Sequence, residues 1–212
     1  MKTSTGLKTK HTSQHKLSVI VKYRPWLYED DLGPYTVDEY TSSSDIGDIH
    51  EGREVTVSDY LYDESRYINF VLAVLNYENI SWLEVVYSPL DPIQGQPKLS
   101  FSNIQEWFAY LKKELKEPQL YPIAENLKRG DIVLYNDIRN VLKIMFRDIA
   151  HYELANKASG LYLLNYGDMY LYPYSRIPLD TVIQLAAKYG LYVNPRDYID
   201  GYPIDVDKYR IV

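Results

Sequence analysis

The sequence predicts an α+β protein, with strands and helices in its N-terminal half and a helix-rich C-terminal half. A hydrophobic content of 46% is enough for a packed core and excludes a disordered chain. Short runs of β-branched residues near the N-terminus indicate strands. Apolar residues three and four positions apart later in the chain indicate amphipathic helices. Cysteine is absent, which excludes disulfides and thiolate metal sites.

The N-terminal part begins with two expected strands. Residues 17–21 are mostly β-branched and predict the first strand. Residues 25–53 are rich in Pro, Gly, Asp and Ser, which favours a long loop with little regular structure. Residues 54–58 predict the second strand, because Val55 and Val57 would share one of its faces.

Two helices are expected next. Apolar residues at helical spacing predict the first from about residue 63 to residue 77. Ser81 is expected to cap a short second helix over residues 82–87, which Ser88-Pro89 would end. The Pro- and Gly-containing residues 91–97 are the predicted boundary between a region of residues 1–92 and a region of residues 98–212.

The C-terminal region is expected to contain three helices and a hairpin. The helical patterns cover residues 104–115, residues 135–151 and residues 179–188. A Tyr-rich stretch at residues 160–174 alternates loosely and predicts a hairpin. Residues 202–212 are expected to form a terminal strand.

Tyrosine is the compositional outlier, with 23 residues against 4 phenylalanines. A tyrosine side chain has an apolar ring and a polar hydroxyl, so it suits half-buried positions on strands. The same chemistry also suits protein interfaces. Both interpretations stay open from the sequence alone.

Charge is distributed unevenly near the N-terminus. Residues 1–24 carry six Lys and Arg and no acid, whereas residues 25–64 carry twelve Asp and Glu and one Arg, Arg53. This contrast suggests binding to charged partners, and a solvated acidic loop is the plain alternative. The basic candidates for phosphate contacts are Lys8, Lys10, Lys16 and Lys22, and the acidic candidates for contacts with a basic protein are Glu29, Asp30, Asp31, Asp38, Glu39, Asp45 and Asp48.

Two segments together carry a resemblance to a known family. Residues 6–21 read Gly-Leu-Lys-Thr-Lys-His-Thr-Ser-Gln-His-Lys-Leu-Ser-Val-Ile-Val, and residues 67–89 contain Asn-Ile-Ser-Trp-Leu-Glu followed by Tyr-Ser-Pro. Over about residues 3–90 the chain resembles bacteriophage-type nucleotidyltransferases. The resemblance implies a small nucleotidyltransferase-like mixed sheet with helices, and a virus- or mobile-element-encoded protein.

The match departs from the family at the positions that carry its chemistry. Where the family has an Asp-x-Asp pair, this chain has Ser13 and His15. Two carboxylates at i and i+2 on a strand converge on divalent metal ions, which activate the attacking hydroxyl. Serine and neutral histidine supply no negative charge for Mg²⁺. The resemblance therefore implies a catalytically degenerate member that needs no cofactor.

One pair of carboxylates elsewhere could replace the missing pair. Asp205 and Asp207 have the i, i+2 spacing on the expected terminal strand, although they lie at the other end of the chain. They are the weak catalytic candidates. Only an active transferase built on them would require Mg²⁺.

Three functional hypotheses follow. The first is a degenerate nucleotidyltransferase-fold protein that binds a protein, or binds nucleotide or nucleic acid through its basic arm. The second is an acidic inhibitor or immunity-type protein that covers a basic site on a partner. The third is an active metal-dependent transferase with displaced carboxylates. No apolar run approaches the roughly 20 residues that span a bilayer, and no signal peptide is visible, so we expect a cytoplasmic protein with no membrane partner.

Overall fold

The computed structural model describes part of the chain in detail. The described residues are 19–22, 42–50, 52–90, 106, 108–109, 111–165, 171–174, 176–194, 198–199 and 202–203. The fold is α+β, as the sequence predicts, with helices packed on an antiparallel sheet.

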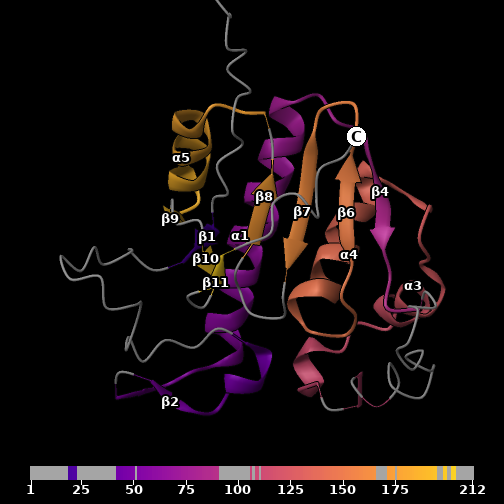
Figure 1. Cartoon of the computed structure of the whole chain (residues 1–212). Coiled ribbons are helices and arrows are strands. Elements are labelled where there is room, and N and C mark those ends of the chain that lie inside the picture. Colours follow the sequence, from indigo (N-terminus) through magenta and orange to yellow (C-terminus); the bar gives the residue numbers. More distant parts are fainter. Residues whose placement is uncertain are drawn as a thin grey trace, which may run out of the picture.

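The sheet has four central strands that are extended at both edges (Figure 1). The central strands, in spatial order, are β4 (Trp82–Tyr87), β6 (Glu153–Asn156), β7 (Leu161–Asn165) and β8 (Leu171–Tyr174). Strand β5 (Ile132–Leu134) extends the β4 edge, and β1 (Val19–Val21) and then β9 (Tyr192–Asn194) extend the β8 edge. Every pair of neighbouring strands is antiparallel.

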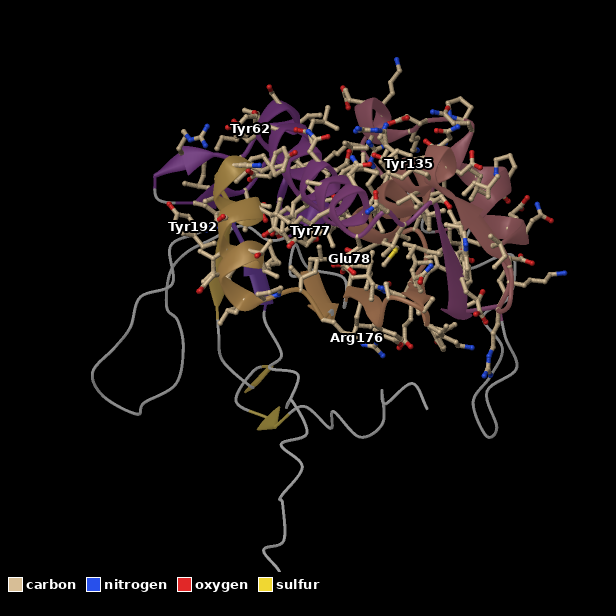
Figure 2. The ribbon with its side chains drawn as sticks, turned by 90° about the horizontal axis from the view of Figure 1, so that it is seen from above. Tyr62, Tyr77, Glu78, Tyr135, Arg176 and Tyr192 are labelled. Carbon is tan, nitrogen blue, oxygen red and sulfur yellow. The ribbon has the colours of Figure 1, made fainter. Side chains whose placement is uncertain are left out.

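Within the described part of the chain, four helices with defined bounds accompany the sheet, and Figure 2 shows the long helices gathered on one of its sides. They are α1 (Val57–Tyr77), α3 (Leu120–Asn126), α4 (Tyr135–Phe146) and α5 (Leu179–Lys188). The remaining elements are the 3-10 turns η1 (Ser43–Asp45) and η2 (Lys113–Leu115), the hairpin of β2 (Ile49–His50) and β3 (Arg53–Glu54), and the paired strands β10 (Tyr198–Ile199) and β11 (Tyr202–Pro203).

Helix α1 is the central helix of the molecule. It begins at a capping box, in which the Thr56 hydroxyl accepts from the Asp59 N–H and the Asp59 carboxylate accepts from the Thr56 N–H. It ends before Asn79, whose positive φ of 55° stops the helix. Its buried face packs with alternating residues of the strands, such as Leu83 and Val85 of β4.

Two of the predicted elements are wrong. Residues 54–58 are not one strand, because β3 ends at Glu54 and Thr56 caps α1. Residues 82–87 are not a helix but strand β4, which pairs with β5 and β6. This segment contains aromatic and β-branched residues, and its buried positions, Leu83 and Val85, alternate with more exposed ones.

The predicted mixed sheet is also not observed, since every strand pair in the described residues is antiparallel. The sheet joins β1 and β4 from the predicted region of residues 1–92 with β5 to β9 from the region of residues 98–212. A single hydrophobic core includes residues from both regions. The C-terminal region therefore contributes strands as well as helices.

Several other predictions agree with the structure. Strand β1 falls within residues 17–21, β7 and β8 form the Tyr-rich hairpin, and α5 matches residues 179–188. The long helix begins at residue 135 as expected but ends at Phe146, ahead of Asp148 with its positive φ of 56°. The predicted helix at residues 104–115 is α-helical at residues 106, 108 and 109, but it does not reach residue 115, because Lys113–Leu115 forms the 3-10 turn η2. Of the predicted strand at residues 202–212, Tyr202–Pro203 forms β11, and the rest lies outside the described residues.

A buried ion pair ties α1 to the end of α4. The Arg147 guanidinium donates to both carboxylate oxygens of Glu64, from Nε at 2.6 Å and from Nη2 at 2.7 Å. Its Nη1 donates to the Leu115 carbonyl at 2.6 Å, and its Nη2 lies 2.8 Å from a carboxylate oxygen of Glu117. Burial opposes the charge of Arg147, but Glu64 and Glu117 more than compensate and raise the pKa of its guanidinium.

The neighbouring residue Asp63 makes a second buried connection. Its carboxylate lies 3.3 Å from Lys22 Nζ, next to β1, and 2.7 Å from Arg66 Nη1. The Arg66 guanidinium also donates to the carbonyls of Tyr189 and Gly190 at the end of α5. The consecutive carboxylates of Asp63 and Glu64 therefore connect α1 to Lys22 beside β1, to Arg66 and through it to the end of α5, and to the end of α4.

We predict that Arg147→Met destabilises the protein by about 3–5 kcal/mol, because it leaves the Glu64 carboxylate buried without its partner. The double variant Glu64→Leu/Arg147→Met should recover a large part of that loss, since it removes both charges. Urea unfolding measures these free energies. The exposed pair between Lys157 and Glu84 provides the control, because Lys157→Met should cost no more than about 1 kcal/mol. If the double variant loses as much free energy of unfolding as Glu64→Leu and Arg147→Met lose when added together, the two charges are not coupled and this explanation is wrong.

Candidate interaction surface

The described part of the acidic stretch is folded, whereas the sequence predicts a loop there. We call residues 42–50 and 52–55 the acidic hairpin. The segment begins with η1, where the Ser42 hydroxyl accepts from the Ser44 N–H at 3.0 Å. It continues as the antiparallel pair β2–β3, which extends from the lower left of the molecule in Figure 1.

Two apolar side chains attach the acidic hairpin to the core. Ile46 and Val55 are both buried in the main hydrophobic cluster. Their surroundings are fixed by backbone hydrogen bonds of 2.9 Å from Gly47 N to the Val55 carbonyl and from Val55 N to the Asp48 carbonyl. Gly47 has a φ of +102°, a conformation that other residues rarely adopt. The hairpin is therefore held at its base and not only at its two ends.

Some carboxylates in this region serve the fold. Asp45 completes the cap of η1, since its Oδ2 accepts from the Ser42 N–H at 3.0 Å. Asp59 caps α1 and also accepts from Arg53 Nη1 at 3.0 Å. Hydrogen bonds from the Thr56 hydroxyl and N–H, followed by that from Arg53, lower the pKa of Asp59 to about 2. Asp63 and Glu64 are buried in the ion pairs of α1.

Other carboxylates face solvent. Asp48 and Glu54 are exposed, and neither makes an ion pair with another described residue. Ile49 directly follows Asp48 in the chain, and its side chain is 62% exposed. Ile49 and Glu54 are directly opposite in the register of β2 and β3, so their side chains share one face of the hairpin. This part of the hairpin, next to its base, thus combines an exposed apolar side chain with nearby negative charges.

Ile49 and Glu54 are surface residues of the hairpin that are not among the residues predicted from the sequence. The sequence does contain a feature that predicts the hairpin. Only two residues, 51 and 52, separate the paired His50 and Arg53, and the second of them is glycine. Such a connection is typical of a tight hairpin turn. Gly52 has the positive φ of 76° that this kind of turn requires.

The described tyrosines range from fully buried to largely exposed. Tyr60 and Tyr152 are buried and donate to the carbonyls of Phe146 and Ala124 at 2.7 and 3.0 Å. Burial raises the pKa of the Tyr152 hydroxyl. By contrast, Tyr62 on α1 is exposed, and the Arg66 guanidinium lies 5.4 Å from its ring centre (Figure 2). Tyrosine therefore serves the core and the surface alike.

Only three of the predicted site residues fall within the described residues. Asp48 faces solvent as expected, and Asp45 is half-buried in its capping role. Lys22 is buried against Asp63, so its ammonium group has a structural partner and is not on an exposed basic surface. The predicted residues outside the described part of the chain are Lys8, Lys10, Ser13, His15, Lys16, Glu29, Asp30, Asp31, Asp38, Glu39, Asp205 and Asp207.

The described residues do not assemble a metal centre. No group of three or more His, Asp or Glu side chains is placed to hold a metal ion within this part of the chain. No helix in the same part is long and apolar enough to cross a bilayer. Comparison with protein-family models, with curated proteins and with solved structures finds no match to this chain.

We predict that Thr56→Ala destabilises the protein by about 1 kcal/mol at neutral pH, because α1 loses its N-cap and Asp59 loses a hydrogen bond. The pKa of Asp59 should rise from about 2 toward its ordinary 3.8, which NMR titration of the carboxyl group would detect. A lowered carboxyl pKa stabilises the fold above the unfolded value, and that contribution disappears as pH falls through the folded value. The stability difference between the two proteins should therefore shrink between pH 4 and pH 2.

Ser58→Ala is the matched control, since it removes an exposed hydroxyl two residues away and should leave the Asp59 pKa unchanged. A stability difference for Thr56→Ala that stays constant down to pH 2 would contradict this role of Asp59.

Proposed function

We propose that this protein is a non-catalytic binding protein, whose acidic hairpin docks on a basic surface of a partner protein. The observation that carries the proposal is the exposed group formed by Asp48, Ile49 and Glu54 on a hairpin held by Ile46 and Val55. An apolar side chain surrounded by charged groups matches the usual composition of a protein interface, in which an apolar centre has a polar rim.

Preorganisation supports the same proposal. The hydrogen bonds at Gly47 and Val55 hold the hairpin in one conformation before any partner binds. Binding then costs little conformational entropy compared with ordering a free loop. The formal net charge of −6 favours fast encounter with a basic partner.

The resemblance to nucleotidyltransferases adds a proposal about chemistry. Ser13 and His15 replace the metal-binding carboxylates of that family, so we propose a scaffold that binds without transferring nucleotides. Binding of nucleotide or nucleic acid through the basic arm is less well supported, because Lys22, one of its four proposed contacts, is buried against Asp63. A protein partner is therefore the better-supported choice.

We predict that Asp48→Lys/Glu54→Lys weakens partner binding about tenfold or more, because it reverses two exposed charges at the centre of the docking surface. The partner is recovered by cross-linking to the wild-type protein, and its affinity is then measured by titration. Affinity for the wild-type protein should also fall as ionic strength rises.

The control Glu125→Lys/Asp180→Lys makes the same change in net charge on α3 and α5, away from the hairpin. It should change affinity less than about threefold, within the range of rim charges. The proposal would be overturned if the affinity did not change with ionic strength, or if the control variant lost as much affinity as Asp48→Lys/Glu54→Lys.

We predict no nucleotidyl transfer above background when the protein is incubated with each labelled nucleoside triphosphate and Mg²⁺ or Mn²⁺. Candidate RNA and protein acceptors are included, and transfer is read from incorporated label. Metal-dependent transfer that disappears in Asp205→Ala would instead support a transferase with displaced carboxylates.

A further inference from the structure

A second surface lies at the opposite edge of the sheet from β1 and β9. Strand β5 is the last strand at this edge and pairs on one side only, with β4. Its residues Ile132 and Leu134 are 51% and 58% exposed, and Trp82, the residue opposite Leu134 on β4, is 36% exposed. We call these three side chains the edge patch.

The edge patch lies on the side of the sheet away from the helices. Side chains alternate along a strand, and Val133 and Leu83 point into the core, so their neighbours in β5 and β4 point the other way. On the same face, nearer the centre of the sheet, β6 carries the buried Ala155 and β7 carries the buried Tyr162 and Leu164. Within the described residues, the exposed aliphatic side chains of this face lie at the β5 edge, and Tyr192 of β9, which is 42% exposed, lies on the same face at the far edge.

The backbone of β5 also presents unused hydrogen-bonding groups at this edge. Asp131 accepts from Val85 N at 2.9 Å, and Tyr135 N donates to the Ser81 carbonyl at 2.9 Å, so both residues face β4. In an antiparallel ladder, alternate residues direct their N–H and C=O groups to opposite sides. Ile132 therefore directs its N–H and C=O outward, and Leu134 directs its N–H outward, where no described strand pairs with them. The C=O of Leu134, the N-cap of α4, accepts the first hydrogen bond of that helix.

The charges at one end of β5 indicate which peptide would fit. Lys128 and Arg129 precede the strand, are exposed, and make no ion pair with other described residues. The nearby Asp131 carboxylate already accepts from the Lys128 N–H at 2.8 Å. At the neighbouring position on β4, Glu84 is paired with Lys157 at 3.5 Å. The surplus charge is therefore positive and lies at the N-terminal end of β5.

We propose that β5 binds an extended segment of a partner protein, which adds an antiparallel strand to the sheet. Apolar side chains at alternate positions of the segment would cover Trp82, Ile132 and Leu134, and acidic residues at its C-terminal end would lie beside Lys128 and Arg129. Strand addition combines main-chain hydrogen bonds with side-chain contacts of this kind. Antiparallel pairing matches every other pair in the sheet.

The size of the edge patch favours a peptide over a second copy of this chain. Three half-exposed side chains offer on the order of 300 Å². A stable interface between two globular proteins needs roughly 800 Å² from each partner. A single extended strand needs less side-chain area, because the exposed N–H and C=O groups contribute to its binding.

The test uses a fluorescein-labelled peptide of sequence Thr-Val-Thr-Val-Thr-Glu-Glu and a second peptide that ends in Lys-Lys. Fluorescence anisotropy should show saturable binding, tighter for the acidic peptide by about threefold to tenfold. The variant Lys128→Glu/Arg129→Glu should reverse this preference. NMR should show the amide signals of Ile132 and Leu134 shifting on titration of the wild-type protein.

Two further variants locate the binding site. Ile132→Pro removes an N–H that faces outward, so it should weaken binding at least tenfold while the protein stays folded. Leu134→Thr should weaken binding about fivefold, and folding should be preserved because Leu134 is the N-cap of α4, where threonine is favourable. Ile183→Thr on α5 removes another exposed isoleucine and should leave binding unchanged.

Three results would overturn the proposal. They are an absence of saturable binding by either peptide, equal binding of both peptides, and a dimer in sedimentation experiments that Ile132→Pro abolishes. The last result would assign the edge to a second copy of the chain.

Discussion

The structure depends on two consecutive carboxylates of α1 that are satisfied inside the protein. Glu64 binds Arg147 at the end of α4, and Asp63 binds Lys22 beside β1 and Arg66 on α1. Through the carbonyls that Arg147 and Arg66 also bind, these pairs reach the segment at Leu115 and the end of α5. Buried charges stabilise a fold only when they are paired and hydrogen-bonded, so these contacts require each segment to take one position.

This constraint divides the acidic residues of the N-terminal region into two groups. Asp45, Asp59, Asp63 and Glu64 are used by the fold as caps or buried partners. Asp48 and Glu54 are exposed on the hairpin that ends just before α1. Of the six acidic residues that the structure describes in this stretch, only these two therefore present an exposed charge without a structural partner, and both lie next to Ile49.

Sequence patterns predict the α+β class, the Tyr-rich hairpin and α5, because each depends on short-range spacing that one element satisfies alone. They fail where a long-range contact decides. Residues 82–87 follow a serine that could cap a helix, yet they pair with strands that lie about 50 and 70 residues further along the chain. Lys22 belongs to a basic segment by sequence, but only the folded protein places it against Asp63. The folded hairpin at residues 42–55 was missed because its glycines and acids are equally typical of a loop.

The central claim is that the fold holds the acidic hairpin rigidly at its base, so that Asp48, Ile49 and Glu54 are presented in one conformation. Native-state hydrogen exchange at the amides of Gly47 and Val55 tests this claim most directly, since both donate to backbone carbonyls across the base of the hairpin. The account predicts protection that approaches that of the α1 amides near Glu64. Exchange at the rate of an unstructured peptide would show that the hairpin opens freely, and would contradict the account.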